Sequence, residues 1–365
     1  MKKYLVIFLV AATFISCQEV FVPEVEEVEP FLIVEGSIST LNTSHTILIS
    51  LSSKFQHNPL IKGVNSATVY VDDEFGDRTY FYNIANGVYR TDTAETFSAR
   101  LGRSYVLTIE MDDGNIYQSD PQTVVACPEI SSLYCNFGVE SILRENAYGE
   151  AFESPFEGIG VYTGTQGILP FNNYYFYKYL AYEQHKTTIR LGINDVFLYG
   201  HRRLSGKYSS NLVIGNADEF GNYALRTKKV LFIAKEDMVT YDPRIPDTIE
   251  LISTRFEGLI FKLQQYSLSP DAFEFWNDAV TQLEAKGRLF DPVSPQLHGN
   301  IRCVSDSLQK VVGVFYASDV SERISYFYIN TRDQAITRDI ESMPELYLDT
   351  LLWGRKPDDW IDPPN

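Results

Sequence analysis

The pattern of hydrophobic and polar residues predicts short strands, and no helix, between residues 31 and 127. Four segments are rich in β-branched and aromatic residues, and three of them alternate as strands with one buried face do. These segments are 31–36, 46–51, 67–71 and 105–109. Asn86-Gly87 and the polar sequence at 112–115 predict turns. About seven short strands in about 100 residues are typical of an immunoglobulin-like or transthyretin-like sandwich, which we expect over 31–127.

The following region, 128–350, continues the β pattern with longer loops and is expected to form a second, larger β-rich domain. Its later strands are predicted at 297–303, 311–316 and 324–329. We expect a C-terminal tail at 351–365.

One clear helix is predicted in this second region, at about 270–286. Ser269 can cap its N-terminus, Pro270 suits its first turn, and Gly287 can end it. A hydrophobic stripe at helical spacing predicts that the helix packs against a sheet. The stripe consists of Phe273, Trp276, Val280 and Leu283.

An aromatic run begins at Phe171 and continues to Leu180. Its tyrosines could form a contact surface for sugars or for a protein partner, because tyrosine anchors many interfaces. Packing between strands is the alternative, and the alternation favours it, since one face of such a strand is buried in any case. The tyrosines concerned are Tyr174, Tyr175, Tyr177 and Tyr179.

The N-terminus has the pattern of a signal peptide at 1–16: two lysines precede an apolar stretch that is too short to span a membrane. Ser16 directly before Cys17 resembles the cleavage site of bacterial lipoproteins, so we expect Cys17 to be lipidated. Ordinary secretion with a spare thiol at Cys17 is the alternative. Residues 17–30 are expected to form the lipid anchor and an acidic tether. The part that follows Cys17 is rich in glutamate and contains prolines, which is typical of an extended segment. It is either a surface-export signal or a solvated linker.

The composition of the chain limits the classes of partner that can be expected. Lysine and arginine number 31 against 48 aspartates and glutamates, giving a net charge of −17, with no basic stretch. This excludes nucleic acid as an expected partner. Hydrophobic residues make up 44% of the chain, so it is expected to fold. We expect the membrane to be reached only through the lipid anchor.

The sequence contains no motif of a known catalytic class. There is no nucleophile elbow and no phosphate-binding glycine loop, and the five histidines lack metal-ligand spacing. We therefore expect no enzyme activity, no cofactor and no metal. The acids at 72–77 lack the register of a calcium loop and predict a polar hairpin turn. A hydrolase acting on glycans or peptides through a carboxylate pair in the second domain remains the alternative.

Three cysteines besides Cys17 lie in the predicted folded regions. In an oxidising compartment they can form a disulfide. Bridges between Cys135 and Cys303 and between Cys127 and Cys135 are both consistent with the sequence.

Several segments together resemble the Bacteroidota outer-membrane lipoproteins known as the domain of unknown function 4249. The similarity covers nearly the whole mature chain, and the order of the segments is distinctive. In the first half they are Val34-Glu35-Gly36, 66–69, 87–89, 102–107 and 117–119; in the second half they are 272–276, Gly299-Asn300-Ile301, Gly313-Val314-Phe315 and 356–360.

The resemblance implies a lipid-anchored protein of the outer membrane, at the cell surface, that assists nutrient uptake as the partner of a TonB-dependent receptor barrel. It implies no catalytic residues and no particular ligand. A structural or adhesive surface lipoprotein is a further alternative, distinguished by an edge strand that self-associates.

Overall fold

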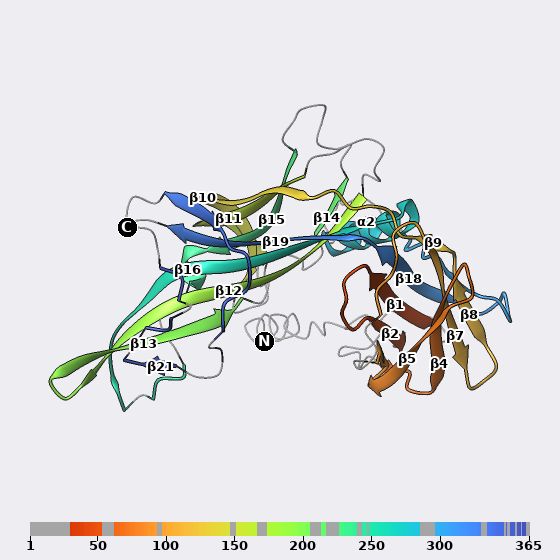
Figure 1. Cartoon of the computed structure of the whole chain (residues 1–365), viewed down its shortest axis with the longest axis horizontal. Helices are drawn as coiled ribbons and strands as arrows, with labels where there is room; N and C mark the ends of the chain where they lie inside the picture. The colour runs from red at the N-terminus through yellow and green to blue at the C-terminus, as the bar shows by residue number, and fades with distance from the viewer. Residues whose placement is uncertain are drawn as a thin grey trace, which may run out of the picture.

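The structure is a computed structural model that describes most of the chain from residue 30 onward. The described residues are 30–52, 62–92, 97–146, 151–165, 174–204, 213–216, 226–238, 243–246, 248–284, 296–329, 334–346, 348, 351–354, 356–358 and 360–362. The expected signal peptide, Cys17 and nearly all of the tether lie outside these residues. The described part forms two β-rich bodies that follow one another along the longest axis (Figure 1). Within these residues, the predicted mainly β class with one clear α-helix is confirmed.

The first body is an 11-stranded sheet with strand order β17-β8-β7-β4-β5-β6-β2-β1-β18, to which β3 adds beside β2 and β9 beside β7. Its strands are β1 (Leu32–Ser39), β2 (Thr46–Leu51), β3 (Lys62–Gly63), β4 (Ala67–Asp73), β5 (Arg78–Ala85), β6 (Val88–Thr91), β7 (Ser104–Met111), β8 (Ile116–Ser119), β9 (Gln122–Thr123), β17 (Ile301–Cys303) and β18 (Val311–Ser318). All four strands predicted in its N-terminal part are present. Alternate residues such as Ile47, Leu107 and Phe315 point into one shared core.

Residues 301–318 belong to this first sheet, although the sequence places them in the second region. β18 pairs in parallel with β1, so that Val34 lies opposite Gly313, and β17 pairs with β8. The side chain of Asn300 joins the two ends of the sheet: its Nδ2 donates to the Phe315 carbonyl at 2.7 Å, and the Phe315 N–H donates to its Oδ1 at 2.9 Å. The expected boundary near residue 128 therefore does not separate the two sheets cleanly.

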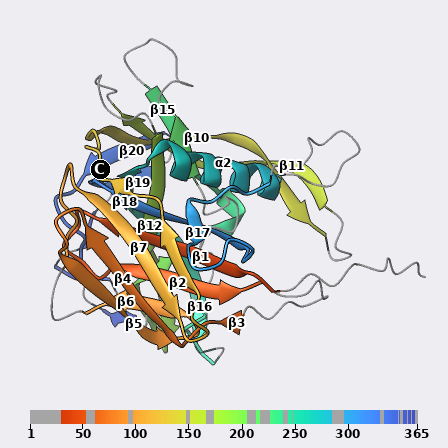
Figure 2. The ribbon, with the colours of Figure 1, turned by 90° about the vertical axis from the view of Figure 1, so that its right-hand side faces the viewer.

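The second body combines a three-stranded and a seven-stranded sheet, and it lies behind the first body in the view of Figure 2. The first has the order β10 (Ile130–Glu145), β11 (Ala151–Thr165), β15 (Arg226–Ala234). The second has the order β20 (Ala335–Asp339), β19 (Val320–Ile329), β16 (Glu250–Ser267), β12 (Tyr174–Leu191), β13 (Asn194–Arg203), β21 (Leu352–Trp353), and β14 (Val213–Asn216) pairs with β12. A short 3-10 helix, η2 (Lys235–Asp237), follows β15. Side chains of both sheets share one core, including Val161 from β11 and Phe261 from β16. Part of the expected tail is thus a strand, β21.

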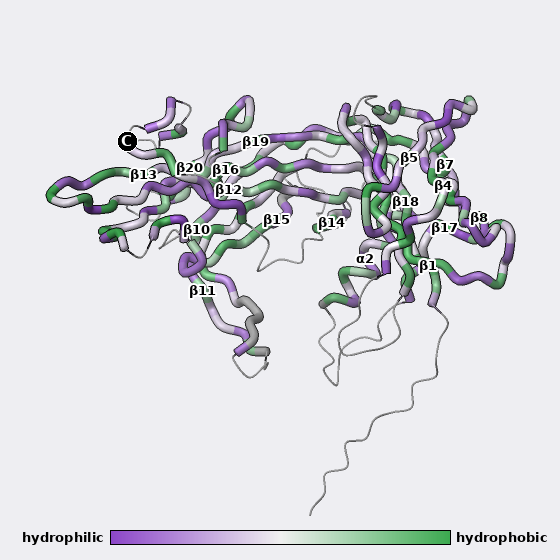
Figure 3. Tube along the Cα trace, turned by 90° about the horizontal axis from the view of Figure 1, so that it is seen from below, coloured by the Kyte–Doolittle hydropathy of each residue, from purple (hydrophilic) through white to green (hydrophobic). Residues whose placement is uncertain are grey.

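The predicted helix is present as α2 (Pro270–Glu284). Ser269 caps it, since its Oγ accepts the Ala272 N–H at 3.3 Å. Trp276 packs against Phe176 of β12, with ring centres 5.2 Å apart, in the hydrophobic region where α2 and β18 meet (Figure 3). Leu283 differs from the prediction, because it lies on the exposed side.

The two bodies are joined by Asp319, the residue between β18 and β19. Its carboxylate accepts a hydrogen bond from the Thr40 hydroxyl at 2.7 Å and another from the Cys127 N–H at 2.9 Å. These bonds fix the end of β1 and the start of the second body to the same point. Among the residues described, no helix is both long and apolar enough to cross a membrane.

Candidate functional site

The four tyrosines of the aromatic run contact other parts of the fold, whereas residues 171–173 lie outside the described residues. Tyr175 and Tyr177 are buried in the core of the second body. Tyr174 stacks on Phe273 of α2 at 4.5 Å between ring centres. Tyr179 stacks in the same way on a neighbouring phenylalanine of β16. The contacts of these four tyrosines are those of packing, because β12 has protein on both faces here.

The three cysteines within the described residues are free thiols. Cys303 lies in the core of the first sheet and Cys135 in that of the second body, so the first of the two bridges that the sequence allows is not formed. Cys127 lies beside the second core, and it does not pair with Cys135 either. Burial raises the pKa of Cys127 to about 12 and that of Cys135 to about 11, which makes both thiols unreactive near neutral pH.

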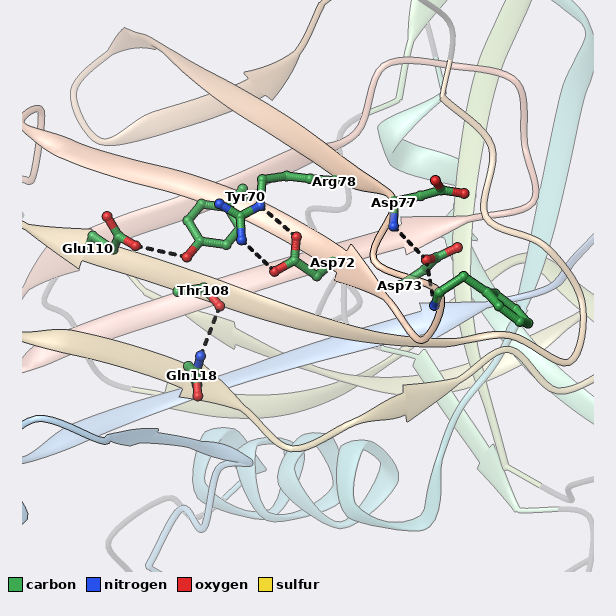
Figure 4. A network of polar contacts seen from close by, with 9 residues as sticks. Tyr70, Asp72, Asp73, Asp77, Arg78, Thr108, Glu110 and Gln118 are labelled. Atoms are coloured by element: carbon green, nitrogen blue, oxygen red, sulfur yellow. Dashed lines mark hydrogen bonds and ion pairs between the residues drawn. The ribbon is translucent and has the colours of Figure 1, made fainter.

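The acidic segment at 72–77 is the polar hairpin turn between β4 and β5 that the sequence predicts (Figure 4). One carboxylate oxygen of Asp73 accepts the N–H groups of Phe75 and Asp77, each at 2.9 Å, and Arg103 contacts the other oxygen. Burial pushes the pKa of Asp73 upward, but these hydrogen bonds outweigh it and leave the pKa below its usual value. The described residues contain no group of three or more side chains that could hold a metal ion. The Asp73 carboxylate is thus fully engaged in holding the turn together.

On the outer face beside this turn, polar and aromatic side chains contact one another across strands. Arg78 makes two hydrogen bonds with Asp72, at 2.7 and 2.9 Å, and lies 3.6 Å above the ring of Tyr70. The Tyr70 hydroxyl donates to Glu110 at 2.8 Å. Figure 4 shows these groups engaged with one another. This network ties strands β4, β5 and β7 together on the outer face.

A polar cleft of about 210 Å³ lies where β1 and β2 of the first sheet face β12 and β16 of the second. Glu35 and Ser37 line it from β1, and His45 lines it from the segment that leads into β2. Lys178 and Tyr266 line it from the second body. We call this the interdomain cleft. It brings together ionisable groups that are far apart in the sequence.

The alternation of β1 sends Glu35 into this cleft. Val34 and Gly36 face the core, whereas Glu35, between them, faces outward opposite Leu48 of β2. The protein around Glu35 raises the pKa of its carboxyl group, although the side chain keeps contact with solvent, and the positive charge of Lys178 opposes the rise. Gly36 packs closely in the core, since a Cβ there would lie 3.2 Å from a side-chain atom of Ile47 and 3.4 Å from one of Phe315.

His45 has a structural role at the edge of the cleft. Its ring nitrogen Nε2 lies 3.1 Å from the Phe97 carbonyl, and its own N–H donates to the Thr91 hydroxyl at 3.0 Å. Burial lowers the pKa of His45, so the neutral ring is favoured. His45 therefore holds the segment before β2 in place and is not positioned as a ligand.

A shallow groove of about 650 Å³ runs beside β19 and β20 and contains several acids. Here Arg323 donates to both carboxylate oxygens of Asp339 and also to the Ile130 carbonyl at 2.8 Å. The hydrogen bond from Arg323 lowers the pKa of Asp339. A general acid needs the opposite shift. This groove therefore offers no support for a carboxylate-pair hydrolase.

Apolar side chains are exposed at the end of the seven-stranded sheet that lies farthest from the first body (Figure 1). Ile193, in the turn between β12 and β13, is 96% exposed, and Trp353 of β21 is 54% exposed. Trp353 borders a pocket of about 260 Å³ that is also lined by Leu198, Ile245 and Leu351. We call this region the distal apolar end. The sequence analysis did not identify it, because its residues come from separate segments.

Three of the segments on which the family resemblance rests meet in the fold. Val34-Glu35-Gly36, Gly299-Asn300-Ile301 and Gly313-Val314-Phe315 lie side by side, through the β1–β18 pairing and the Asn300 bonds. No curated protein matches the chain significantly. The model of one family, described as a domain of unknown function (DUF4249), matches residues 18–324. The chain therefore belongs to the DUF4249 family.

Proposed function

We propose that this protein is a non-enzymatic, lipid-anchored accessory of the outer membrane that binds a TonB-dependent receptor barrel, its substrate, or both. The predicted signal peptide, the lipidation site at Cys17 and the acidic tether support the location. Acyl chains contribute about 0.8 kcal/mol per buried CH₂, so an acylated Cys17 would hold the acidic domains at the membrane surface. The receptor as partner comes from the family resemblance.

The distal apolar end is the observation that carries the binding part of this proposal. Soluble proteins rarely leave several large apolar side chains together in solvent, and such surfaces mark interaction sites. An exposed tryptophan beside an apolar pocket matches the composition of binding hot spots. Arg244 also lines the pocket and donates to the Leu348 carbonyl at 2.7 Å, which holds the pocket wall in place.

The location of this end favours a large partner. It lies opposite the first body along strands β12 and β16, as Figure 1 shows, so a partner bound there would not collide with the first sheet. The receptor barrel is the occupant that we propose.

The test is purification of the tagged lipoprotein from native outer membranes under gentle detergent extraction, with mass spectrometry of the bound proteins. A receptor barrel is the expected result. The double variant Ile193→Ser/Trp353→Ser is expected to reduce its recovery about tenfold or more, because loss of hot-spot side chains costs about 2 kcal/mol or more.

The matched control is Leu308→Ser, since Leu308 is 86% exposed on a turn of the first sheet, away from the distal apolar end. This variant should recover the barrel as the parent does. Recovery of the lipoprotein alone would contradict the receptor partner and favour the adhesive or hydrolase alternative. Full recovery by the double variant would contradict binding through the distal apolar end. Circular dichroism spectra identical to the parent's would show that each variant is folded.

A further inference from the structure

Lys178 is a cation in the interdomain cleft that forms no direct ion pair among the described residues. Its Nζ lies 4.8 Å from the ring centre of Tyr266 and 5.6 Å from that of Phe176. Within the described part of the chain it makes neither an ion pair nor a hydrogen bond. The two rings hold the ammonium group by cation–π attraction. In a protein with a net charge of −17, such a lysine can accept an external anionic group.

Glu35 provides the opposite charge in the same cleft. The charge of Lys178 influences the ionisation of Glu35, yet no direct ion pair joins the two groups among the described residues. Their separation leaves the carboxylate and the ammonium each able to bind a ligand group. Ser37 and Ser44 line the same cleft. Ser44 donates to the Thr91 carbonyl at 3.4 Å and Ser37 bonds with Tyr316, so their hydroxyl oxygens can add hydrogen bonds as acceptors from the ligand's ammonium group.

The arrangement selects the chemistry of the ligand. A neutral sugar would stack on an open aromatic face, but Lys178 lies over the rings of Tyr266 and Phe176. Glu35 would repel a simple anion, and Lys178 would repel a simple cation. The volume of about 210 Å³ is below the roughly 300 Å³ of pockets for drug-sized molecules. A small molecule with one charge of each sign fits these conditions.

We infer that the interdomain cleft binds a small zwitterion, an α-amino acid or a short peptide, with the ligand's ammonium group at Glu35 and its carboxylate at Lys178. The inference does not depend on a receptor partner, because the cleft lies at the opposite end of β12 from the distal apolar end. Failure of one proposal would leave the other unaffected.

Isothermal titration calorimetry on the full chain in detergent micelles tests this inference. The probes are L-alanyl-L-alanine, its N-acetylated form, which lacks the cation, and its C-amidated form, which lacks the anion. We expect the dipeptide to bind. The affinity for each blocked form should be at least about tenfold lower, because each lacks one charge-assisted hydrogen bond.

Two substitutions assign each ligand group to its residue. Glu35→Gln should weaken dipeptide binding about tenfold and abolish the penalty for N-acetylation. Lys178→Met, which keeps the aliphatic packing on the rings, should do the same for C-amidation. The controls are Glu74→Gln, in an exposed turn, and Lys186→Met, because Lys186 lies on the same strand with its Nζ 3.8 Å from the ring centre of Phe197. Both controls should bind the dipeptide as the parent does.

Three outcomes would overturn the inference. The first is no measurable heat with the dipeptide for a protein with a native circular dichroism spectrum. The second is equal affinity for the dipeptide and its blocked forms. The third is binding that survives both Glu35→Gln and Lys178→Met. Binding of maltose that Lys178→Met leaves unchanged would instead assign the cleft to neutral glycans.

Discussion

Replacing Asn300 with alanine should open the junction between the two ends of the first sheet. The amide of Asn300 satisfies both the N–H and the carbonyl of Phe315, and all these groups are buried. Asn300→Ala leaves a donor and an acceptor without partners, and each such group costs about 1–3 kcal/mol, so the total is about 2–6 kcal/mol. Domains are stable by only about 5–15 kcal/mol in all. The change is thus expected to remove a large part of the stability of the first sheet.

Urea denaturation followed by far-ultraviolet circular dichroism measures this loss as a lower unfolding midpoint. The control is Asn83→Ala, because Asn83 is exposed and makes only a long contact of 3.4 Å with Asn65. Its effect should stay within about 0.5 kcal/mol. A loss below about 1 kcal/mol for Asn300→Ala would refute the reasoning, since it would show that solvent or other groups satisfy Phe315 equally well.

A second variant, Asn300→Asp, separates the donor from the acceptor. It retains an oxygen for the Phe315 N–H but directs a carboxylate oxygen at the Phe315 carbonyl, which raises the pKa of the new acid above its unfolded value of about 3.9. A raised pKa means that the folded state gains stability as the acid is protonated. The deficit relative to the parent should therefore shrink as the pH falls through the raised pKa. A constant deficit across that range would contradict the assigned geometry.

Three further predictions concern glycine packing, thiols and pH. Gly313→Ala should lower the free energy of unfolding, measured by urea denaturation, by about 1–3 kcal/mol, because a Cβ there would overlap the Val34 carbonyl oxygen. Gly138→Ala is the control: a Cβ at Gly138 would meet open space, so the change should be neutral or stabilising by at most about 1 kcal/mol. Burial raises the pKa of Cys127 to about 12 and that of Cys135 to about 11, so both thiols should resist iodoacetamide near neutral pH in the folded protein. All three described cysteines should be alkylated after denaturation without reductant, and mass spectrometry showing a disulfide among them would contradict this. Burial lowers the pKa of His45, so the neutral ring should stabilise the fold fully above pH of about 6.5, and this contribution should be lost as the pH falls through the lowered pKa of the folded state. His45→Gln should flatten this part of the curve of stability against pH. An unchanged slope in the variant would count against the assignment to His45.

Local sequence signals predict the strands and turns of this fold well. At Asn86-Gly87 both residues have positive φ, 47° and 74°, as the hairpin between β5 and β6 requires. Ser269 caps α2 as expected. Each of these features depends on residues within a few positions, so a short segment of sequence contains the information. The placement of β17 and β18 in the first sheet has no such local signal, because β1 and β18 pair across most of the chain.

The same limit applies to the interdomain cleft. Alternation in β1 predicts that Glu35 lies on the face opposite to Val34, and the sequence alone goes no further. Which residue faces Glu35 is decided by the junction at Asp319, which fixes β12 and β16 beside the first sheet. The cysteines show the converse. The sequence is consistent with a bridge between Cys135 and Cys303, but the two residues lie in separate cores.

The continuous pairing of β12 with β16 has a mechanical consequence. The ladder runs from Tyr175 opposite Ser267 to Arg190 opposite Glu250, and a strand of 18 residues is about 60 Å long. Lys178 lies near one end of β12, and the hairpin turn with Ile193 follows its other end. A pulling force applied at that turn, along the strand, would load many hydrogen bonds at once in shear instead of breaking them one after another. The second body should therefore resist stretching along β12 far better than peeling of its edge strand β20.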